Sequence, residues 1–402
     1  MNHMASQAAQ LNPACTRQRV IVALSGGVDS AVAALMLQQA GCEVEGLFVM
    51  CWPSNDPFCR ADLDFQAASE VAKDLAIELH RISLVDAYRT HVFEPFLSGL
   101  HQGLTPNPDL LCNQVIKFGL LKEYAMRLGA RWFATGHHAR LAQGPDGLQY
   151  LLRGGDPVKD QSYFLATLGQ EALRQVLFPI GHLSKGQVRA IAANHGLRNH
   201  DRPGTAGLCL VGPRRFGEFV EAHLTMEPGP IHTWEGHVLA QRHLGLARYT
   251  IGQRTGLGLG ALKGIGSGPW FVADKRPAAN VLVVASGEHH PALYHDVALC
   301  REPHWIGRPP PLPSMLMAKT RYRQADQPCV VHDRPEDGGL AVHFMQSQRA
   351  LTPGQAIVFY MGGVCLGAAT VHRSFSAASP GDVHSPLSVN RRPYGDIDLE
   401  IT

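Results

Sequence analysis

The chain has 402 residues, 45% of them hydrophobic and 17% charged, with a formal net charge of +2 at pH 7. This length exceeds one ordinary core, so we expect two or three domains. No window approaches about 18 consecutive apolar residues, which excludes a conventional transmembrane helix. The sequence before Arg19 lacks the apolar segment of a secretory signal, so we expect a cytoplasmic protein. Because that sequence also lacks acidic residues and carries Arg17, an organellar matrix is the alternative location.

The cysteines and the net charge say less about which class of protein this is. The nine cysteines show no CxxC spacing, which is typical of a reducing compartment rather than a disulfide framework. The net charge is too small to demonstrate a nucleic-acid partner. Two local basic clusters are candidate phosphate contacts, although solvated basic faces are common: Arg214 with Arg215, and Lys319 with Arg321 and Arg323.

The chain begins with a predicted strand, a tight turn and a helix. Residues 20–24 form an unbroken apolar run, as in a strand buried on both faces of a parallel sheet. Residues 31–40 are rich in helix formers, and Gly41 occupies the position of a left-handed cap. Between them, the turn Ser25-Gly26-Gly27-Val28-Asp29-Ser30 lets backbone N–H groups approach an anion at a helix N-terminus. We therefore predict a phosphate-binding loop.

The type of loop follows from what the turn lacks. It has neither the Gly-Lys-Ser/Thr ending of a Walker loop nor the three spaced glycines of a dinucleotide loop. It resembles the SGGxDS loop of enzymes that cleave ATP between the α and β phosphates and adenylate a substrate. A plain glycine turn between strand and helix is the alternative.

The next segments predict a doubly wound parallel sheet. Residues 44–50 and 78–84 are expected strands, and residues 62–75 between them have helical periodicity. Strands and helices that alternate in this way form a parallel sheet, with the ligand at the carboxyl ends of the strands.

A cysteine follows in an unusual position. After an expected helix at 87–99, Pro106 and Pro108 predict a rigid loop, with a new helix from about Asn113. Cys112 would then lie at a helix N-terminus, where the dipole favours a thiolate. The alternative is a small buried apolar residue.

The strand expected within residues 130–141 ends in Gly136-His137-His138. Adjacent histidines on a strand point in different directions, which argues against a metal pair and favours a turn that faces a nucleotide.

Further on, residues 216–224 predict a short helix. Short apolar runs at 281–285, 329–332, 341–344 and 356–360 predict a small β-barrel. Residues 374–402 show no folding period.

Five motifs occur in a fixed order: SGGVDS, TPNPDLLCN, ATGHHAR, KDQSYFL and GLCLVG. Together they resemble the signature series of the bacterial and organellar tRNA-specific 2-thiouridylases. The resemblance extends through HLGLARYTIGQR, PWFV, KTRYRQ and TPGQ, and covers roughly residues 19–373.

The resemblance implies a fold and a division of the chain. It implies a doubly wound α/β pyrophosphate-loop domain, a small central tRNA-binding domain and a C-terminal β-barrel. The expected bounds are 19–212, 213–286 and 287–373, with a flexible extension at 1–18 and a low-complexity tail at 374–402.

It also implies an enzyme, a tRNA-uridine 2-sulfurtransferase. ATP would adenylate the carbonyl oxygen of the wobble uridine, and sulfur from a cysteine persulfide would replace it, releasing AMP and pyrophosphate. By resemblance, Cys209 receives the persulfide and Cys112 is the nucleophile that completes the transfer, leaving a disulfide between them. Asp109 is the candidate acid or base.

The binding residues and partners also come from the resemblance. ATP, with Mg²⁺ near Asp29, would contact Ala23, Leu24, Ser25, Gly26, Gly27, Val28, Asp29, Ser30, Val49 and Gly136. The tRNA would contact Asn107, Pro108, Asp109, Lys159, Asp160, Gln161, Arg321 and Tyr322. The expected partners are tRNAs for lysine, glutamate and glutamine, and a persulfide donor such as a cysteine desulfurase or a sulfur-relay protein. No prosthetic group is expected.

The sequence departs from the family's motifs at two places, and three alternative functions stay open. Gly204-Thr205-Ala206 stands where the family has Asp-Ser-Thr, and Cys51 stands where it has Asn. The rivals are a ligase or amidase that adenylates a carboxylate, a tRNA-binding protein without catalysis, and a protein whose Cys112 and Cys209 ligate an iron–sulfur cluster.

Overall fold

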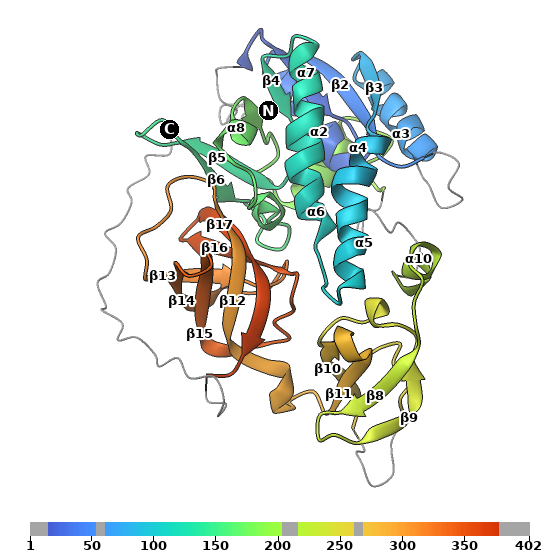
Figure 1. Cartoon of the computed structure of the whole chain (residues 1–402). Coiled ribbons are helices and arrows are strands. Elements are labelled where there is room, and N and C mark those ends of the chain that lie inside the picture. Colours follow the sequence, from blue (N-terminus) through green and yellow to red (C-terminus); the bar gives the residue numbers. More distant parts are fainter. Residues whose placement is uncertain (1–14, 54–60, 203–215, 261–267, 378–402) are drawn as a thin grey trace.

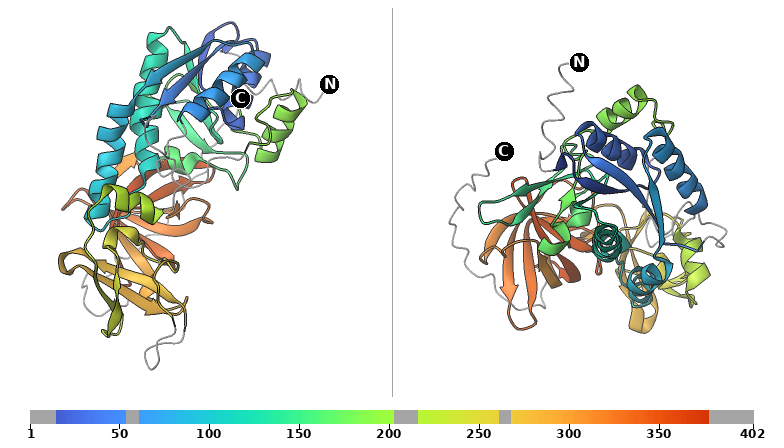
Figure 2. Two further views of the ribbon diagram at one scale, coloured as in Figure 1. Left: turned by 90° about the vertical axis from the view of Figure 1, so that its right-hand side faces the viewer. Right: turned by 90° about the horizontal axis from the view of Figure 1, so that it is seen from above.

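The computed structural model describes residues 15–53, 61–202, 216–260 and 268–377. These form an α/β region, a small central β-rich region and a β-barrel. The barrel and the central region lie side by side at one end of the α/β region (Figures 1 and 2). Cys209, Gly204-Thr205-Ala206 and Arg214-Arg215 lie outside the described residues, as does most of the predicted tail. Within the described part, no helix is both long and apolar enough to cross a membrane.

The α/β region is built on a parallel sheet in the order β3-β2-β1-β4-β7. Its strands are β1 (Arg19–Ala23), β2 (Glu43–Met50), β3 (Leu79–Ser83), β4 (Trp132–Ala134) and β7 (Val176–Leu177). The doubly wound arrangement predicted from the sequence is confirmed. The strand predicted within 130–141 is shorter than expected, because β4 ends at Ala134.

Different helices cover the two faces of this sheet. Val20 and Val22 of β1 are fully buried in one apolar cluster, while Ile21 between them is buried in another. The first cluster contains side chains of α2 (Val28–Gln39), α3 (Ala61–Asp74) and α9 (Lys185–Asn194). Because both faces are covered, β1 is apolar throughout. Gly41 has φ +80°, in agreement with the predicted left-handed cap.

A helical hairpin covers the second face. Its descending arm comprises α4 (Val85–Tyr88), the π-helical segment η2 (Arg89–Phe93) and α5 (Glu94–His101). Its returning arm comprises α6 (Pro108–Leu111), the π-helical segment η3 (Cys112–Leu121) and α7 (Lys122–Arg127).

The start of the returning arm corrects the sequence prediction. The helix begins at Pro108 and not near Asn113, because Asn107 caps it and accepts the Asp109 N–H at 3.1 Å. Proline is well suited to the first helical position, where its missing N–H costs nothing. Cys112 therefore lies in the second turn, and the argument that a helix terminus favours its thiolate is wrong.

The barrel contains a hairpin from the α/β region. Its sheet has the order β12-β15-β14-β13-β16-β17-β6-β5, and an additional β12–β17 pairing closes it. The strands are β5 (Ala139–Gln143), β6 (Gln149–Arg153), β12 (Tyr294–Trp305), β13 (Ser314–Lys319), β14 (Gln327–Arg334), β15 (Gly339–Arg349), β16 (Ala356–Met361) and β17 (Val364–Phe375). Hairpin β5–β6 joins through Val364 opposite Leu152 and Cys365 opposite Leu151. The sequence did not predict this junction.

The central region has a mixed sheet in the order β10-β11-β8-β9 and the helix α10 (Phe216–His223). The strands are β8 (Gly229–Thr233), β9 (Val238–His243), β10 (Trp270–Arg276) and β11 (Val281–Ser286). The run at 281–285, which we expected in the barrel, is β11, because it pairs with β10 and β8 instead. Short helical turns complete the described part of the chain: η4 (Ser162–Leu165), α8 (Gln170–Leu173), η5 (Leu246–Arg248), η6 (Pro277–Ala279) and η7 (Pro291–Leu293).

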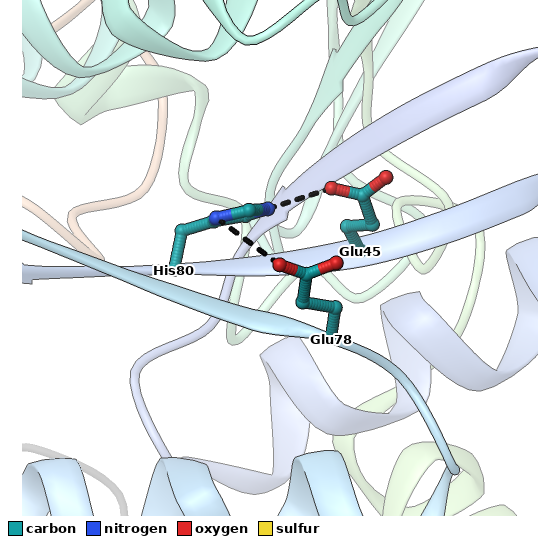
Figure 3. A group of neighbouring side chains, drawn as sticks. All are labelled: Glu45, Glu78 and His80. Atoms are coloured by element: carbon teal, nitrogen blue, oxygen red, sulfur yellow. Dashed lines mark hydrogen bonds and ion pairs between the residues drawn. The ribbon is translucent and has the colours of Figure 1, made fainter.

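An ion-pair network ties the amino-terminal halves of β1, β2 and β3 together, and Figure 3 shows its members Glu45, Glu78 and His80. Arg19 donates to both carboxylate oxygens of Glu45, at 2.6 and 2.8 Å. His80 lies 2.7 Å from Glu45 and 3.8 Å from Glu78. Glu45, Glu78 and His80 have the spacing of metal ligands, but Arg19 already neutralises Glu45. We interpret the network as a structural link between strands.

Candidate active site

The Ser25–Ser30 turn joins β1 to α2 at the carboxyl edge of the sheet. The Ser25 N–H donates to Ser30 Oγ at 3.2 Å, and Ser30 Oγ donates to the Gly27 carbonyl at 3.0 Å. Gly26 has φ +74°, a left-handed conformation that favours glycine. The N-cap of α2 is Gly27, so no side chain caps the first turn of the helix. This is the geometry of an anion site at a helix N-terminus.

Asp29 in the first turn of α2 is paired with two groups from later in the chain. Its Oδ1 lies 2.6 Å from Lys185 Nζ and 3.4 Å from His138 Nε2. Burial favours the neutral carboxyl, but the hydrogen bonds from His138 and Lys185 and the Lys185 charge outweigh it and lower the pKa of Asp29. The site therefore holds an ionised carboxylate beside a partly buried ammonium group.

Lys185 is a residue that the sequence reasoning missed. Ser184 caps α9 and forms a reciprocal capping box with Gln187. The signal was present, because Ser-Lys-Gly-Gln predicts a helix start, and the helix follows the carboxyl end of β7 at the same sheet edge as the loop. Only the contact with Asp29 could not be inferred.

The Gly136-His137-His138 turn packs directly on the phosphate loop, while its contact with a nucleotide stays a prediction. A Cβ atom at Gly136 would lie 2.6 Å from both the Asp29 carbonyl carbon and the Ser30 nitrogen. His137 is buried and its Nδ1 lies 2.7 Å from Thr135 Oγ1, and burial lowers the pKa of its imidazole well below its ordinary value. His138 Nδ1 lies 3.2 Å from the Leu183 carbonyl. The two rings therefore have different hydrogen-bond partners.

The remaining residues predicted at the nucleotide belong to the same edge. Ala23 is the last residue of β1, and Leu24 donates its N–H to the Leu47 carbonyl of β2 at 2.9 Å. Val49 is half-buried near the end of β2 and packs on the apolar cluster of the second sheet face.

Cys112 lies in an apolar environment. Its side chain is buried, in a cluster with Val92, Phe96 and Ile116 of the helical hairpin and Phe219 of α10. Asn113 is also buried and donates from Nδ2 to the Phe164 carbonyl at 2.9 Å. The predicted Cys112–Cys209 pair stays a prediction, since Cys209 is outside the described residues.

The predicted tRNA-contact segments, 159–161 and 321–322, lie next to each other although they are far apart in sequence. Tyr322 packs against Phe164 with ring centroids 4.5 Å apart, and Arg323 lies 5.3 Å from the centre of the Tyr322 ring. Arg321 is exposed and donates to the Ala350 carbonyl at 3.0 Å. Tyr322 thus already packs against two aromatic rings inside the protein, those of Phe164 and Tyr163.

Two members of the predicted Lys159-Asp160-Gln161 contact have internal partners. Asp160 is buried, accepts the N–H groups of Gly154 and Ser162, and pairs with Arg153 at 3.6 Å and Lys319 at 3.9 Å. Gln161 accepts the His138 N–H at 2.8 Å. Lys319, expected at a phosphate, is itself buried beside Asp160. These side chains lie beneath the surface and are held by contacts inside the protein.

The loop before Asn107 is held by both β-rich regions. The Thr105 N–H donates to the Pro353 carbonyl of the barrel at 2.9 Å. Lys275 of β10 donates to the Tyr249 carbonyl at 3.0 Å and lies 3.4 Å from the Leu104 carbonyl. Residues 104–105 are therefore the point where the three parts of the chain meet, immediately before Asn107, Pro108 and Asp109.

A parallel sheet whose first strand runs into this SGGVDS turn defines the class of pyrophosphate-loop α/β enzymes. Family models agree with the three parts. A "tRNA methyl transferase HUP domain" matches residues 18–213, a "tRNA methyl transferase PRC-barrel domain" matches 217–286, and an "Aminomethyltransferase beta-barrel domain" matches 296–371.

Full-length relatives identify the family. The tRNA-specific 2-thiouridylase of Methylococcus capsulatus is 47% identical over 91% of this chain and 99% of its own length. That of Alkalilimnicola ehrlichii is 49% identical over 87% of this chain and 96% of its own length. Among solved structures, an NMN synthetase from Francisella tularensis aligns with 52% of this chain and 76% of its own at 21% identity and a TM-score of 0.33. The chain belongs to the family of tRNA-specific 2-thiouridylases, and as a member of it is a tRNA sulfurtransferase.

Proposed function

We propose that this chain thiolates C2 of the wobble uridine in tRNAs for lysine, glutamate and glutamine, using ATP and a cysteine persulfide. The observation that carries the proposal is the near full-length match to the thiouridylases, in a chain whose phosphate loop bears the Asp29–Lys185 pair. An oxide leaving group is poor, so the uracil oxygen has to be activated before sulfur can replace it.

The first step is adenylation. The O2 atom of uracil attacks the α phosphate of ATP, the α–β bond breaks, and pyrophosphate leaves. The N–H groups at the start of α2 would bind that pyrophosphate, and Lys185 would balance its charge. A magnesium ion that arrives with ATP would meet Asp29, which is already paired with Lys185. The ion would therefore be held mainly by phosphate oxygens and water, as is usual for Mg²⁺.

The second step is sulfur transfer. The terminal sulfur of a Cys209 persulfide attacks C2, and the oxygen leaves with AMP. The Cys112 thiolate then attacks the inner sulfur of Cys209, which forms a Cys112–Cys209 disulfide and releases the C2 thiocarbonyl. Asp109 is the candidate acceptor of the Cys112 proton, and a dithiol reductant must supply two electrons to restore both thiols. Because Cys112 is buried beside Phe219 of α10, its thiol has to be uncovered before it reacts.

The test is a thiolation assay with purified protein, ATP, Mg²⁺, a persulfide donor and unmodified tRNA. Thiolated tRNA is retarded in a mercury-containing gel. Cys112→Ala and Cys209→Ala should each abolish the product, while Cys51→Ala is the matched control and should retain it. A transcript with cytidine at the wobble position should not react. Full activity in either cysteine variant would contradict the assigned roles.

A further inference from the structure

The carbonyl oxygen of Gly26, inside the phosphate loop, is held by two side chains from a distant segment. Asn199 Nδ2 and Arg202 NH1 each donate to it at 3.0 Å. Both residues lie just after α9, and each is more than 170 positions after Gly26 in the sequence. The second guanidinium nitrogen of Arg202 donates to Asp64 Oδ1 of α3 at 2.6 Å. Arg202 therefore bridges the phosphate loop and helix α3, which packs against the sheet.

This contact determines the direction of a loop N–H. A peptide unit is planar and trans, so the Gly26 carbonyl and the Gly27 N–H point in opposite directions. With the carbonyl directed at Asn199 and Arg202, the Gly27 N–H faces the Ser25 hydroxyl, 3.4 Å away on the exposed side of the loop. A peptide between two glycines can rotate at little cost, so it keeps one orientation only if something holds it.

The packing around Gly26 leaves no room for a side chain at this position. A Cβ atom there would lie 2.8 Å from the Ala67 Cβ of α3 and 2.9 Å from Arg202 NH1. Asn199 is buried as well, and its Oδ1 has no hydrogen-bond partner among the described residues. A buried amide with one unsatisfied atom is costly, so its donated bond to Gly26 has to compensate.

We propose that Arg202, assisted by Asn199, is a positioning residue that orients the Gly26–Gly27 peptide for binding the ATP phosphates. The inference deepens the proposed function and rests on its use of ATP. A guanidinium group can reach the Gly26 carbonyl and Asp64 at once through separate nitrogens, whereas a lysine ammonium is a single point charge. Arg202 also precedes Cys209 by seven residues, so the segment that orients the loop is continuous with the one that bears the persulfide cysteine.

The chain supplies a matched control in Arg198. It belongs to the same segment and pairs with Asp74 of the same helix α3 at 2.7 Å, but it is exposed and Asp74 is not in the loop. Arg198→Ala removes an ion pair between the same two elements without affecting Gly26. Loss of general stability is therefore separated from loss of loop orientation.

The experiment measures ATP binding by titration calorimetry without tRNA, and ATP and tRNA kinetics in the thiolation assay. Arg202→Ala should raise the Kd and the KM for ATP by about tenfold, because a hydrogen bond from a charged donor is lost. The KM for tRNA and the kcat at saturating ATP should change by less than about twofold. Asp64→Ala, which keeps the Gly26 contact and removes the carboxylate that anchors Arg202, should show a smaller increase in the same direction, and it is the variant to use if Arg202→Ala does not fold.

The outcomes separate the two proposals. Equal ATP affinity in Arg202→Ala and Arg198→Ala, or an equal rise in the KM values for ATP and tRNA, would overturn the role of Arg202. ATP binding that depends on Arg202 in a protein that forms no thiolated tRNA would support this inference and contradict the proposed function. Failure of the wild-type protein to bind ATP would overturn both.

Discussion

The backbone N–H of Thr105 donates to the carbonyl oxygen of Pro353 at 2.9 Å, which ties the loop before the Cys112 helix to the barrel. Lys275 contacts the same loop from the central region. The loop that precedes the predicted nucleophile is thus fixed by the two regions that flank it, and its stability depends on contacts between regions.

Lys275 gives this junction a dependence on pH. Burial lowers the pKa of its ammonium group from 10.5 to about 8. Between those values the unfolded chain keeps a proton that the folded chain has released, so stability from this group rises with pH. The stability of wild type relative to Lys275→Met should therefore increase by about 1 to 2 kcal/mol between pH 7 and pH 9.5. Urea unfolding at both pH values measures it, with Arg276→Met at the neighbouring exposed position as the control. A difference that stays constant or falls would contradict the assignment.

Glu45 should make the sheet sensitive to acid. The hydrogen bond from Arg19, assisted by His80 and opposed by burial, lowers the pKa of Glu45 from 4.5. A carboxyl whose folded pKa is depressed stabilises the fold above its unfolded pKa and loses that contribution as the pH falls through the folded value. Glu45→Gln should cost about 1 kcal/mol at pH 7, and the difference should shrink below about pH 4.5. Thermal unfolding across this range tests it, with exposed Glu43→Gln on the same strand as the control.

Lys185 should affect ATP and not tRNA. Removing the ammonium group leaves the ionised Asp29 without its nearest positive partner, beside the loop that we propose binds the ATP phosphates. Lys185→Ala should raise the KM for ATP by roughly tenfold or more, while the Kd for tRNA stays unchanged. The control is Arg189→Ala, an exposed cation on the same helix. An unchanged KM for ATP in Lys185→Ala would show that the lysine serves only the fold.

Arg321 should behave as a phosphate contact. It is exposed beside Tyr322, on the surface formed with the 159–164 segment. Arg321→Ala should weaken tRNA binding and reduce the slope of log Kd against log salt concentration by about 1, because one fewer counterion is released. ATP binding should not change. Arg301→Ala, an exposed barrel arginine on β12, is the control; a slope that falls equally in both variants would point to a general charge effect.

Local patterns predicted much of the α/β region and little of what joins it to the rest. The apolar run at 20–24 predicted the buried strand β1, and the glycine turn after it predicted the tight link from that strand to a helix. The helix start at Pro108 was missed because proline was interpreted as a breaker, although it is favoured at the first helical position. The Asp29–Lys185 and Gly26–Arg202 contacts join residues more than 150 positions apart, so no local pattern encodes them.

The β-rich parts were harder to predict because a strand's partners decide its sheet. Residues 281–285 have the composition of a barrel strand, yet Leu282 lies opposite Ile231 in the central sheet. Residues 139–153 follow β4 of the α/β region in sequence, but they form the hairpin β5–β6, and β6 pairs with β17 of the barrel. The apolar pattern predicted the strand at 281–285 but not the two strands within 139–153, and only pairing across the chain assigns all three to their sheets.

The β5–β6 hairpin has a practical consequence for building hybrid enzymes. Because Leu151 and Leu152 are paired with the edge of β17, a chimera that takes residues 287–377 from a relative would place a foreign strand against the host hairpin. The smallest exchangeable unit therefore includes residues 139–153, although they lie in the first half of the chain. Crossover points chosen from sequence order alone would cut through a continuous hydrogen-bonded ladder and should yield aggregation-prone products.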